Sequence, residues 1–352
     1  MSASTASVRR VLICEESLTY GAALSRLLRC DPAIEVVEVC SSAETAIARL
    51  SQLEPRPDLV TMDLELPGMS GGKAIEHIMN VLPIPILALS GGVRSGSREA
   101  RAALAAGAVD AVPKDGLDLL DLDGPRSRAF RRRVKVLAGV PVIRHPRASL
   151  AHEAPVTAAT LGGAASIIGV AASAGGPQAL AAVLAEVPVT FPIPILVVQH
   201  MVDGFGEGFA RWLDGQVPLA VRVARNRGAP EPGIWVAPDG AHLTLDSAGG
   251  LMLDTHRVSG LHRPSADVLL RSLAARAGSH AVAVVLTGMG RDGAEGLGEV
   301  RREGGLTIAQ DEATSSVFGM PKAAIERGAQ LILGPSEIGR LLRALRPVAP
   351  VS

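Results

Sequence analysis

Ser173 follows a run of apolar residues and opens a glycine-rich turn. Residues 166–171 are typical of a short buried parallel strand. Residues 173–177 read Ser-Ala-Gly-Gly-Pro, which supplies small residues for a tight turn and a proline suited to the start of a helix. We therefore expect a strand, a turn and a helix with Ser173 at the apex. Three roles stay open for this serine: a catalytic nucleophile, a turn residue without chemistry, or part of a loop whose N–H groups bind an anion.

A histidine and an aspartate follow two other predicted strands in the same half of the chain. His200 comes shortly after the predicted strand 193–198, and Asp292 follows the apolar run 281–286. The carboxyl ends of parallel strands meet at one edge of a sheet, so both side chains could lie near Ser173. A serine hydroxyl needs a neighbouring base to become a nucleophile, and that base needs a carboxylate that fixes its tautomer. These three residues could supply the three roles.

A glycine-rich stretch just before Asp292 could complete such a site. Gly288 and Gly290 flank Met289, so the Met289 N–H could approach an oxyanion without hindrance from neighbouring side chains. Ordinary explanations compete, because a strand-end histidine is often structural and an Asp-Gly pair after a strand is often a turn or a helix cap. Spacing alone does not decide between these interpretations.

A second set of polar residues follows the strands predicted in the first half of the chain. Its members lie at or just after the ends of apolar runs: Glu15, Glu16, Asp63, Ser90 and Lys114. Carboxylates gathered at one sheet edge can hold Mg²⁺, which prefers hard oxygen ligands and often bridges to a phosphate. A lysine beside them could neutralise phosphoryl oxygens. The ordinary alternative is a set of loop residues in a doubly wound sheet.

Strands and helices alternate along the first half of the chain. The apolar runs predict five strands, each followed by a helix, the last at about 117–136. The predicted strands are 8–14, 34–40, 59–62, 86–89 and 108–112. This alternation predicts an α/β fold with a doubly wound, five-stranded parallel sheet.

The alternation resumes in the second half and again predicts a doubly wound α/β domain. A more β-like insertion interrupts it. Two short apolar runs, 219–223 and 234–236, precede a predicted β-hairpin at 242–254 that turns at 248–250.

The length of 352 residues suits two domains. We expect a first domain at 1–137, a linker rich in proline, alanine and threonine at 138–163, and a second domain at 164–352. Acidic and basic residues are equal in number, so the charge gives no indication of nucleic acid or a membrane surface as a partner.

Features of a membrane or secreted protein are missing from the sequence. No uncharged apolar run reaches the roughly 18 residues of a spanning helix, and the N-terminus lacks a signal-peptide core. We expect a cytoplasmic protein without membrane insertion. The cysteines, Cys14, Cys30 and Cys40, lack metal-ligand spacing and are expected to be reduced structural thiols.

The first half resembles the receiver domain of bacterial response regulators. Asp63, in the stretch Pro-Asp-Leu-Val-Thr-Met-Asp-Leu-Glu-Leu-Pro-Gly-Met, matches the phosphoacceptor aspartate of that family. The resemblance implies that Glu15 and Glu16 bind Mg²⁺ together with Asp63. It also implies that Ser90 is the switch hydroxyl and that Lys114 contacts the phosphate.

Three positions depart from the receiver pattern. Glutamate stands at residue 16 where that family usually has aspartate, Ala111 occupies the place of an aromatic switch residue, and Asp115 follows the lysine where proline is common. Glutamate carries its carboxylate one methylene farther out, which weakens the fit to an octahedral metal. We therefore expect a partly degenerate receiver, with weak Mg²⁺ binding and phosphorylation that is poorly coupled to output.

The second half resembles the catalytic domain of the chemotaxis protein-glutamate methylesterases and glutamine deamidases, the CheB family. The matching stretches follow one another in fixed order: 168–177, 199–201, 237–243, 263–269, 286–293, 308–314 and 317–321. The resemblance implies that Ser173 is the nucleophile and His200 the general base and acid. It further implies that Asp292 orients the histidine and that the Met289 N–H binds the oxyanion. A receiver followed by this domain is that family's usual architecture.

This second resemblance implies a function. The expected reaction is hydrolysis of glutamate γ-methyl esters, and deamidation of glutamines, on methyl-accepting chemotaxis receptors, with no cofactor for the esterase step. A chemotaxis histidine kinase would be the phosphodonor, and a monomer is expected. Ala174 replaces a common threonine, and Asp203 adds a carboxylate near the substrate.

Two other classes of protein remain open. One is an adaptor that binds receptor or kinase with little turnover. The other is a transcription factor, although the second half lacks a helix-turn-helix pattern.

Overall fold

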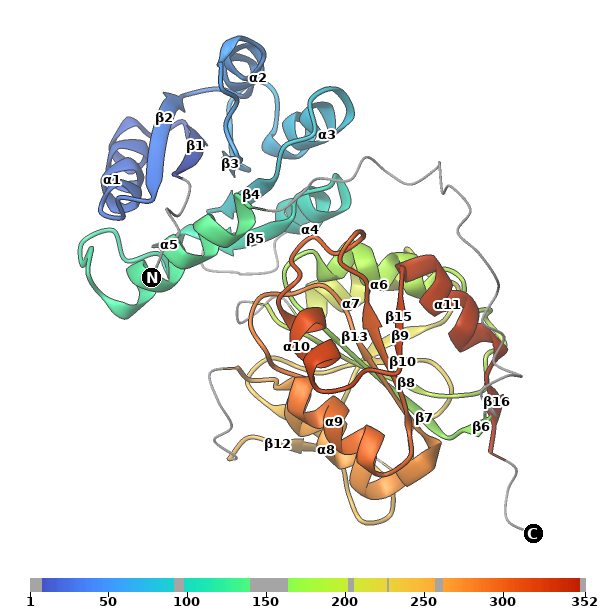
Figure 1. Ribbon diagram of the computed structural model, residues 1–352. Coiled ribbons are helices and arrows are strands. Elements are labelled where there is room, and N and C mark those ends of the chain that lie inside the picture. The colour runs from blue at the N-terminus through green and yellow to red at the C-terminus, as the bar shows by residue number, and fades with distance from the viewer. Residues whose placement is uncertain are drawn as a thin grey trace. The chain divides into compact units, whose positions relative to one another are not determined.

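The computed structural model describes residues 8–91, 98–139, 164–201, 206–226, 228–256 and 262–348. The chain forms two compact units, 1–148 and 149–352 (Figure 1). The predicted linker at 138–163 lies outside the described residues, apart from its first two positions. No helix of the described part is long and apolar enough to cross a membrane.

The first unit contains one parallel sheet with strand order β2-β1-β3-β4-β5. Its elements along the chain are β1 (Arg9–Cys14), α1 (Leu18–Arg29), β2 (Ile34–Cys40), α2 (Ala43–Gln52), β3 (Leu59–Asp63), α3 (Gly71–Val81), β4 (Ile86–Ser90), α4 (Arg98–Ala105), β5 (Asp110–Pro113), a 3₁₀ turn (Lys114–Gly116) and α5 (Pro125–Leu137). Strands β3 and β4 are buried along their whole length, as expected for parallel strands covered on both faces.

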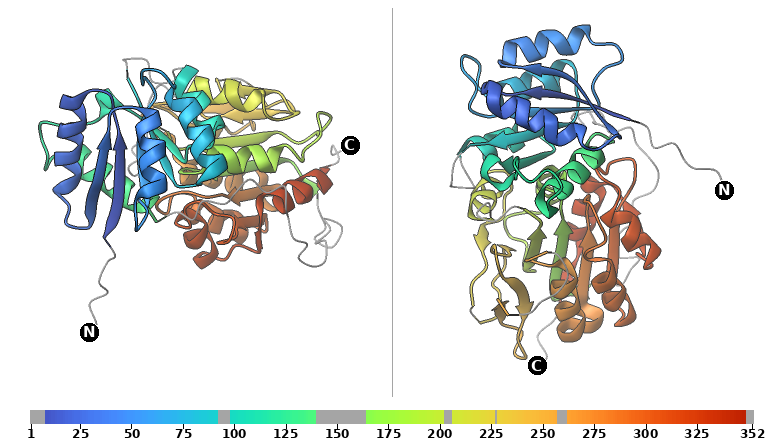
Figure 2. Two further views of the ribbon diagram at one scale, coloured as in Figure 1. Left: turned by 90° about the horizontal axis from the view of Figure 1, so that it is seen from above. Right: turned by 90° about the vertical axis from the view of Figure 1, so that its left-hand side faces the viewer.

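Helices cover both faces of this sheet (Figure 2). Helix α1 contacts α5, whereas α2 contacts α3 and α3 contacts α4. The predicted start of the last helix was wrong, because α5 begins at Pro125 and not near residue 117. Proline suits the first turn of a helix, where its missing N–H has no partner to lose. The Ser127 hydroxyl lies 2.7 Å from the carbonyl oxygens of both Asp118 and Asp121, which holds the preceding segment as a loop.

The second unit contains a seven-stranded parallel sheet with strand order β15-β14-β13-β7-β8-β10-β9. Its elements are β6 (Ala164–Ala165), β7 (Ile167–Ala172), α6 (Gly176–Leu184), β8 (Ile195–Gln199), α7 (Gly206–Asp214), β9 (Val221–Val223), β10 (Ile234–Val236), β11 (His242–Leu245), β12 (Leu251–Asp254), α8 (Ala266–Ala277), a 3₁₀ turn (Gly278–His280), β13 (Ala281–Val285), α9 (Ala294–Arg302), β14 (Leu306–Gln310), α10 (Met320–Glu326), β15 (Leu331–Leu333), α11 (Pro335–Ala344) and β16 (Arg346–Pro347).

The predicted β-like insertion is smaller than expected. Strands β9 and β10 belong to the main sheet, where β10 pairs in parallel with β8. All three residues of β10 are buried, which is typical of a strand covered on both faces and not of an exposed insertion. The hairpin was predicted correctly, because β11 and β12 pair in an antiparallel manner as a separate two-stranded sheet.

Alternate side chains of the second sheet enter two hydrophobic cores. One core includes Ile168 and Val170 and is covered by α6, α7 and α11. The other includes Ile167 and Ala171 and is covered by α8, α9, α10 and the hairpin. Strand β7 lies in the middle, with β8 on one side and β13 on the other. From β7 the chain first adds strands on the β8 side and later on the β13 side, so the winding direction switches at β7. The carboxyl ends of strands at such a switch form the usual ligand crevice of an α/β sheet.

Helices α6 and α11 pack so closely that one glycine is required between them. A Cβ atom at Gly339 would lie 2.3 Å from the Val183 carbonyl oxygen. We expect Gly339→Ala to lower the free energy of unfolding by about 1–3 kcal/mol, because backbone must move. The control is Gly298→Ala in α9, where the nearest atom is 3.8 Å away. Equal stability of the two variants in urea unfolding would contradict this packing.

Candidate functional site

The three residues predicted for nucleophilic chemistry follow three adjacent strands. Ser173 comes after β7, His200 after β8 and Asp292 after β13. The His200 N–H donates to the Ala172 carbonyl at 2.9 Å, so the β7 and β8 ladder continues to the residue beside the serine. Adjacent strands lie about 4.8 Å apart, so Ser173 and His200 are neighbours across the sheet. On the other side, the Ser173 N–H donates to the Thr287 carbonyl at 3.0 Å.

A hydrogen bond to Asp292 sets the tautomer of His200. The His200 Nε2 atom lies 2.8 Å from Oδ2 of Asp292. An ionised carboxylate only accepts hydrogen bonds, so Nε2 carries the proton and Nδ1 has a free lone pair. Nδ1 is buried and makes no hydrogen bond within the described residues. The ring of His262 stacks on that of His200 with centroids 4.2 Å apart. His200 is therefore prepared to accept a proton through Nδ1.

The amino terminus of α8 holds the Asp292 carboxylate in place. Oδ2 accepts the Ala266 N–H at 2.7 Å, and Oδ1 accepts the Asp267 N–H at 2.9 Å and the Ser265 hydroxyl at 2.9 Å. Burial alone would raise the pKa of Asp292. The hydrogen bond from His200, its positive charge when the ring is protonated, and the helix N–H groups outweigh burial and hold this pKa well below its usual range. Asp292 is therefore ionised at neutral pH.

A second carboxylate, on Asp267, makes the reciprocal contact. Its Oδ1 accepts the N–H groups of Gly293 at 3.0 Å and Gly296 at 2.8 Å, at the start of α9. Burial, and then the charge of Asp292, raise the pKa of Asp267. Asp292 thus binds the amino terminus of α8, which carries Asp267. Asp267 in turn binds the amino terminus of α9, which begins just after Asp292, so Asp292 is held between the two helices.

The sequence interpretation missed Ser265 and Asp267. The available signal was a capping pattern, because Ser265 is the N-cap of α8 and accepts a hydrogen bond from the Val268 N–H. That pattern predicts the start of a helix. It does not predict that the same turn binds a carboxylate from a distant strand end.

The glycine-rich loop after β13 lies directly against the serine. A Cβ atom at Gly288 would lie 2.7 Å from Ser173 Cβ and 2.3 Å from Met320 Sδ, so only glycine permits this approach. The Gly288 carbonyl accepts the Met320 N–H at 2.8 Å, which ties the loop to the start of α10. The Met289 N–H makes no hydrogen bond within the described residues and is available to an oxyanion.

The turn that carries Ser173 is fixed from the other side of the loop. Gly175 has a φ of +74° and lies so close to Ser316 that a Cβ atom would be 2.5 Å from it. The buried hydroxyl of Thr287 donates to the Ala174 carbonyl at 2.9 Å. Ala174 is itself buried. Asp203, which was predicted near the substrate, lies outside the described residues.

The charged residues of the first unit gather around one lysine. Lys114 Nζ lies 2.7 Å from Oδ2 of Asp63 and 2.7 Å from Oε2 of Glu15. Both carboxylates are only 1 % exposed. Burial raises the pKa of Glu15 although the hydrogen bond from Lys114 opposes it. Burial would lower the pKa of Lys114, but its hydrogen bonds to the two carboxylates raise it overall. Tyr20, which the sequence analysis missed, places its ring 5.0 Å from Nζ and donates its hydroxyl to the Lys114 carbonyl.

Ser90 and Glu16 are the remaining predicted site residues of this unit. Ser90 is buried at the end of β4, next to the strand of Asp63. Glu16 is exposed, and the described residues contain no group of three acidic, histidine or cysteine side chains that could hold a metal. Two carboxylates, Glu15 and Asp63, nevertheless converge on one cation. Mg²⁺ is often bound by one or two carboxylates plus water and phosphate, so this pair fits it.

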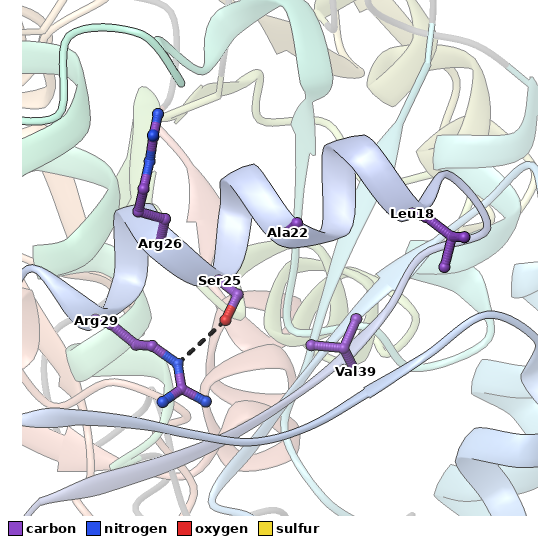
Figure 3. A pocket seen from close by; sticks show the side chains of 6 residues that line it. All are labelled: Leu18, Ala22, Ser25, Arg26, Arg29 and Val39. Atoms are coloured by element: carbon purple, nitrogen blue, oxygen red, sulfur yellow. Dashed lines mark hydrogen bonds between the residues drawn. The ribbon is translucent and has the colours of Figure 1, made fainter.

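A hollow on the first unit is lined by residues other than these. It lies between α1 and β2, has a volume of about 490 Å³, and is lined by Leu18, Ala22, Ser25, Arg26, Arg29 and Val39 (Figure 3). Arg29 Nε donates to Ser25 Oγ, one turn earlier on α1, at 3.2 Å. The predicted acidic residues contribute nothing to its lining.

Comparisons with known proteins cover both units. Residues 168–342 match the family model described as CheB methylesterase, and residues 11–121 match the response regulator receiver domain. A protein of Anaeromyxobacter dehalogenans named protein-glutamate methylesterase/protein-glutamine glutaminase 2 is 42 % identical over 342 residues, which are 96 % of each chain. A Myxococcus xanthus protein, number 3 of the same name, is 42 % identical over 90 % of this chain and 88 % of its own.

Solved structures also match parts of the chain. The catalytic domain of Thermotoga maritima CheB methylesterase is 38 % identical, with a TM-score of 0.49, over 51 % of this chain and 97 % of its own. Each family model matches one of the two units, and the relative from Anaeromyxobacter dehalogenans aligns along both. The chain therefore belongs to the CheB methylesterase family and joins its catalytic domain to an amino-terminal receiver domain.

Proposed function

We propose that the protein hydrolyses glutamate γ-methyl esters, and deamidates glutamines, on methyl-accepting chemotaxis receptors, under control of its receiver domain. One observation carries the reaction type: the 2.8 Å hydrogen bond between His200 and Asp292 leaves Nδ1 of the imidazole without a partner among the described residues, on a residue whose backbone is bonded to Ala172, just before Ser173. The substrate class comes from relatives named protein-glutamate methylesterase/protein-glutamine glutaminase. Receptor side chains of this kind would meet the enzyme in the cytoplasm.

In the first half of the reaction, Ser173 Oγ attacks the γ-carbonyl carbon while His200 Nδ1 takes the serine proton. The carbonyl oxygen becomes an oxyanion that accepts a hydrogen bond from the Met289 N–H. Asp292 stays ionised and stabilises the imidazolium. Collapse of the tetrahedral intermediate breaks the bond to methoxide or amide. The leaving group takes the proton from His200 and departs as methanol or ammonia.

In the second half, water replaces the leaving group. His200 Nδ1 removes a proton from water as it attacks the γ-glutamyl ester of Ser173, and the Met289 N–H binds the new oxyanion. Expulsion of Ser173, which regains its proton from His200, releases glutamate. The esterase reaction needs no further cofactor in this scheme, because the protein residues supply every proton transfer.

The receiver domain supplies the control in this proposal. Asp63 accepts a phosphoryl group from a histidine kinase, and Lys114 Nζ, which already contacts Asp63, pairs with the new phosphoryl charge. Glu15 and Asp63 would hold Mg²⁺, which neutralises phosphoryl oxygens during transfer. Ser90 would bind the phosphoryl group through its hydroxyl. Ala111 has no ring that could change position on phosphorylation, so the change in output should be small.

Replacement of the serine tests the reaction directly. With methylated receptor as substrate, Ser173→Ala should lower the rate of methanol release by at least about 10³-fold, because the nucleophile is lost. The matched control is Ser166→Ala, which removes an exposed hydroxyl just before the other end of β7 and should leave the rate unchanged. An unchanged rate in Ser173→Ala would exclude the triad, and a wild-type protein without turnover would favour a binding adaptor.

Replacement of the aspartate tests the tautomer. In Asp292→Asn, we expect the amide oxygen at the position of Oδ1, which accepts both the Asp267 N–H and the Ser265 hydroxyl, so the amide nitrogen takes the position of Oδ2 and faces Nε2 of His200. The imidazole would then carry its proton on Nδ1 and could not accept the serine proton. We expect kcat to fall by up to about 10⁴-fold with little change in KM. A KM effect without a kcat effect would contradict this role.

The same carboxylate should contribute to acid stability. The folded-state pKa of Asp292 lies below the unfolded value of about 3.9, so its contribution is complete above that pH and is lost as the pH falls further. The difference in free energy of unfolding between wild type and Asp292→Asn, measured in urea from pH 5 to pH 2, should therefore shrink below about pH 4. A constant difference across this range would contradict the lowered pKa.

The two neighbouring glutamates allow a matched test of the receiver. With a small phosphodonor and Mg²⁺, the wild-type mass should rise by one phosphoryl group, and Asp63→Asn should show no such increase. Glu15→Gln should slow the reaction strongly because Glu15 is buried beside Asp63, whereas Glu16→Gln, at an exposed position, should not. Equal effects of both glutamate variants in intact-mass time courses would contradict this assignment.

A further inference from the structure

The side chain of Gln199 joins the strand ends that carry the serine and the histidine. Gln199 is the last residue of β8 and only 5 % exposed. Its Nε2 donates to the Ser173 carbonyl at 2.8 Å and to the His200 carbonyl at 2.9 Å. Both acceptors are carbonyl oxygens, so the amide nitrogen, and not the amide oxygen, must face them. One amide group therefore binds the backbone of both proposed catalytic residues.

These contacts complete a clamp on the serine. Thr287 binds the Ser173 N–H from the β13 side, and Gln199 binds the Ser173 carbonyl from the β8 side. One residue earlier along β7, the Ala172 carbonyl accepts the His200 N–H. Gln199 thus extends the connection between β7 and β8 one residue beyond the paired strands, to the position where the chemistry takes place.

Helix α6 fixes the position of the amide. A Cβ atom at Gly176 would lie 2.0 Å from Gln199 Oε1, so the first turn of the helix packs directly on the side chain. Oε1 is buried and has no hydrogen-bond partner within the described residues. A buried acceptor without a partner is unfavourable for stability. A side chain kept for packing alone would be better replaced here by an apolar one of the same size.

We propose that Gln199 is a positioning residue that sets the distance between Ser173 Oγ and His200 Nδ1. This inference rests on the proposed function, because it assumes that these two atoms exchange a proton. The amide acts through the two carbonyl groups and touches neither reacting atom. Errors of about 1 Å in such a geometry can cost about 100-fold in rate.

Two variants separate the amide donor from the volume of the side chain. Gln199→Met keeps the length but removes the donor, and Gln199→Asn keeps the amide but is one methylene too short to reach both carbonyls. Gln199→Asn also keeps a polar group at this position, so it remains usable if Gln199→Met folds poorly. The control is Gln330→Met. The Gln330 amide oxygen accepts hydrogen bonds from the N–H and the hydroxyl of Thr307, near the amino end of β14 and so at the edge of the sheet opposite to Ser173 and His200.

The readout is the rate at which a fluorophosphonate labels Ser173 in the full chain, divided by the folded fraction at the same temperature. This reaction needs the serine and histidine but no receptor. Both Gln199 variants should label about 10- to 100-fold more slowly, and kcat for methanol release should fall by a similar factor with KM unchanged. Gln330→Met should label at the wild-type rate.

The outcomes separate this inference from the proposed function. Labelling of both Gln199 variants at the wild-type rate would overturn the positioning role even if the enzyme acts on receptors. Absence of labelling at Ser173 in the wild type would instead overturn the triad. Labelling that is slowed in the variants, in a protein that does not act on methylated receptors, would support the positioning role and reject the substrate.

Discussion

The carboxylate of Asp292, whose side chain is only 12 % exposed, is the constraint on which the proposed active site depends. A charge in a protein interior is unfavourable unless hydrogen bonds and opposite charge compensate for it. Here three N–H groups, of Ala266, Asp267 and Gly293, and the ring of His200 provide that compensation. The position of Asp292 then fixes the tautomer of His200, and the tautomer decides which ring nitrogen can receive a proton. The reciprocal contact from Asp267 links α8 to the start of α9.

The order of strands explains why three distant residues meet. The central strand β7 carries the serine, and its two neighbours, β8 and β13, carry the base and the carboxylate. A nucleophile on an edge strand would have only one neighbour. The Thr287 carbonyl accepts the Ser173 N–H from one side, and the Gln199 amide donates to the Ser173 carbonyl from the other, so the same topology that gathers the side chains also restrains the backbone. In the receiver domain, residues at the strand ends form an ionic cluster instead, in which the carboxylates of Glu15 and Asp63 both contact Lys114.

Much of this arrangement was predictable from short apolar runs. They placed Ser173, His200 and Asp292 at strand ends, because buried parallel strands are recognisable by composition. Sequence could not reveal the strand order, so β9 and β10 were assigned to an insertion. Nor could it reveal contacts made by turns far away along the chain, such as those of Ser265 and Asp267 with Asp292. Pro125 was a local signal for the start of α5 that was not used in predicting this helix.

The tautomer of His200 is the most direct test of this account. Nitrogen NMR of the imidazole, in protein labelled with ¹⁵N-histidine and assigned with a His200→Gln variant, reports which ring nitrogen carries the proton. At a pH where the ring is neutral, we expect a protonated Nε2 that is hydrogen-bonded to Asp292 and an unprotonated Nδ1. A neutral ring protonated on Nδ1 would contradict it, because His200 could not then accept the proton of Ser173.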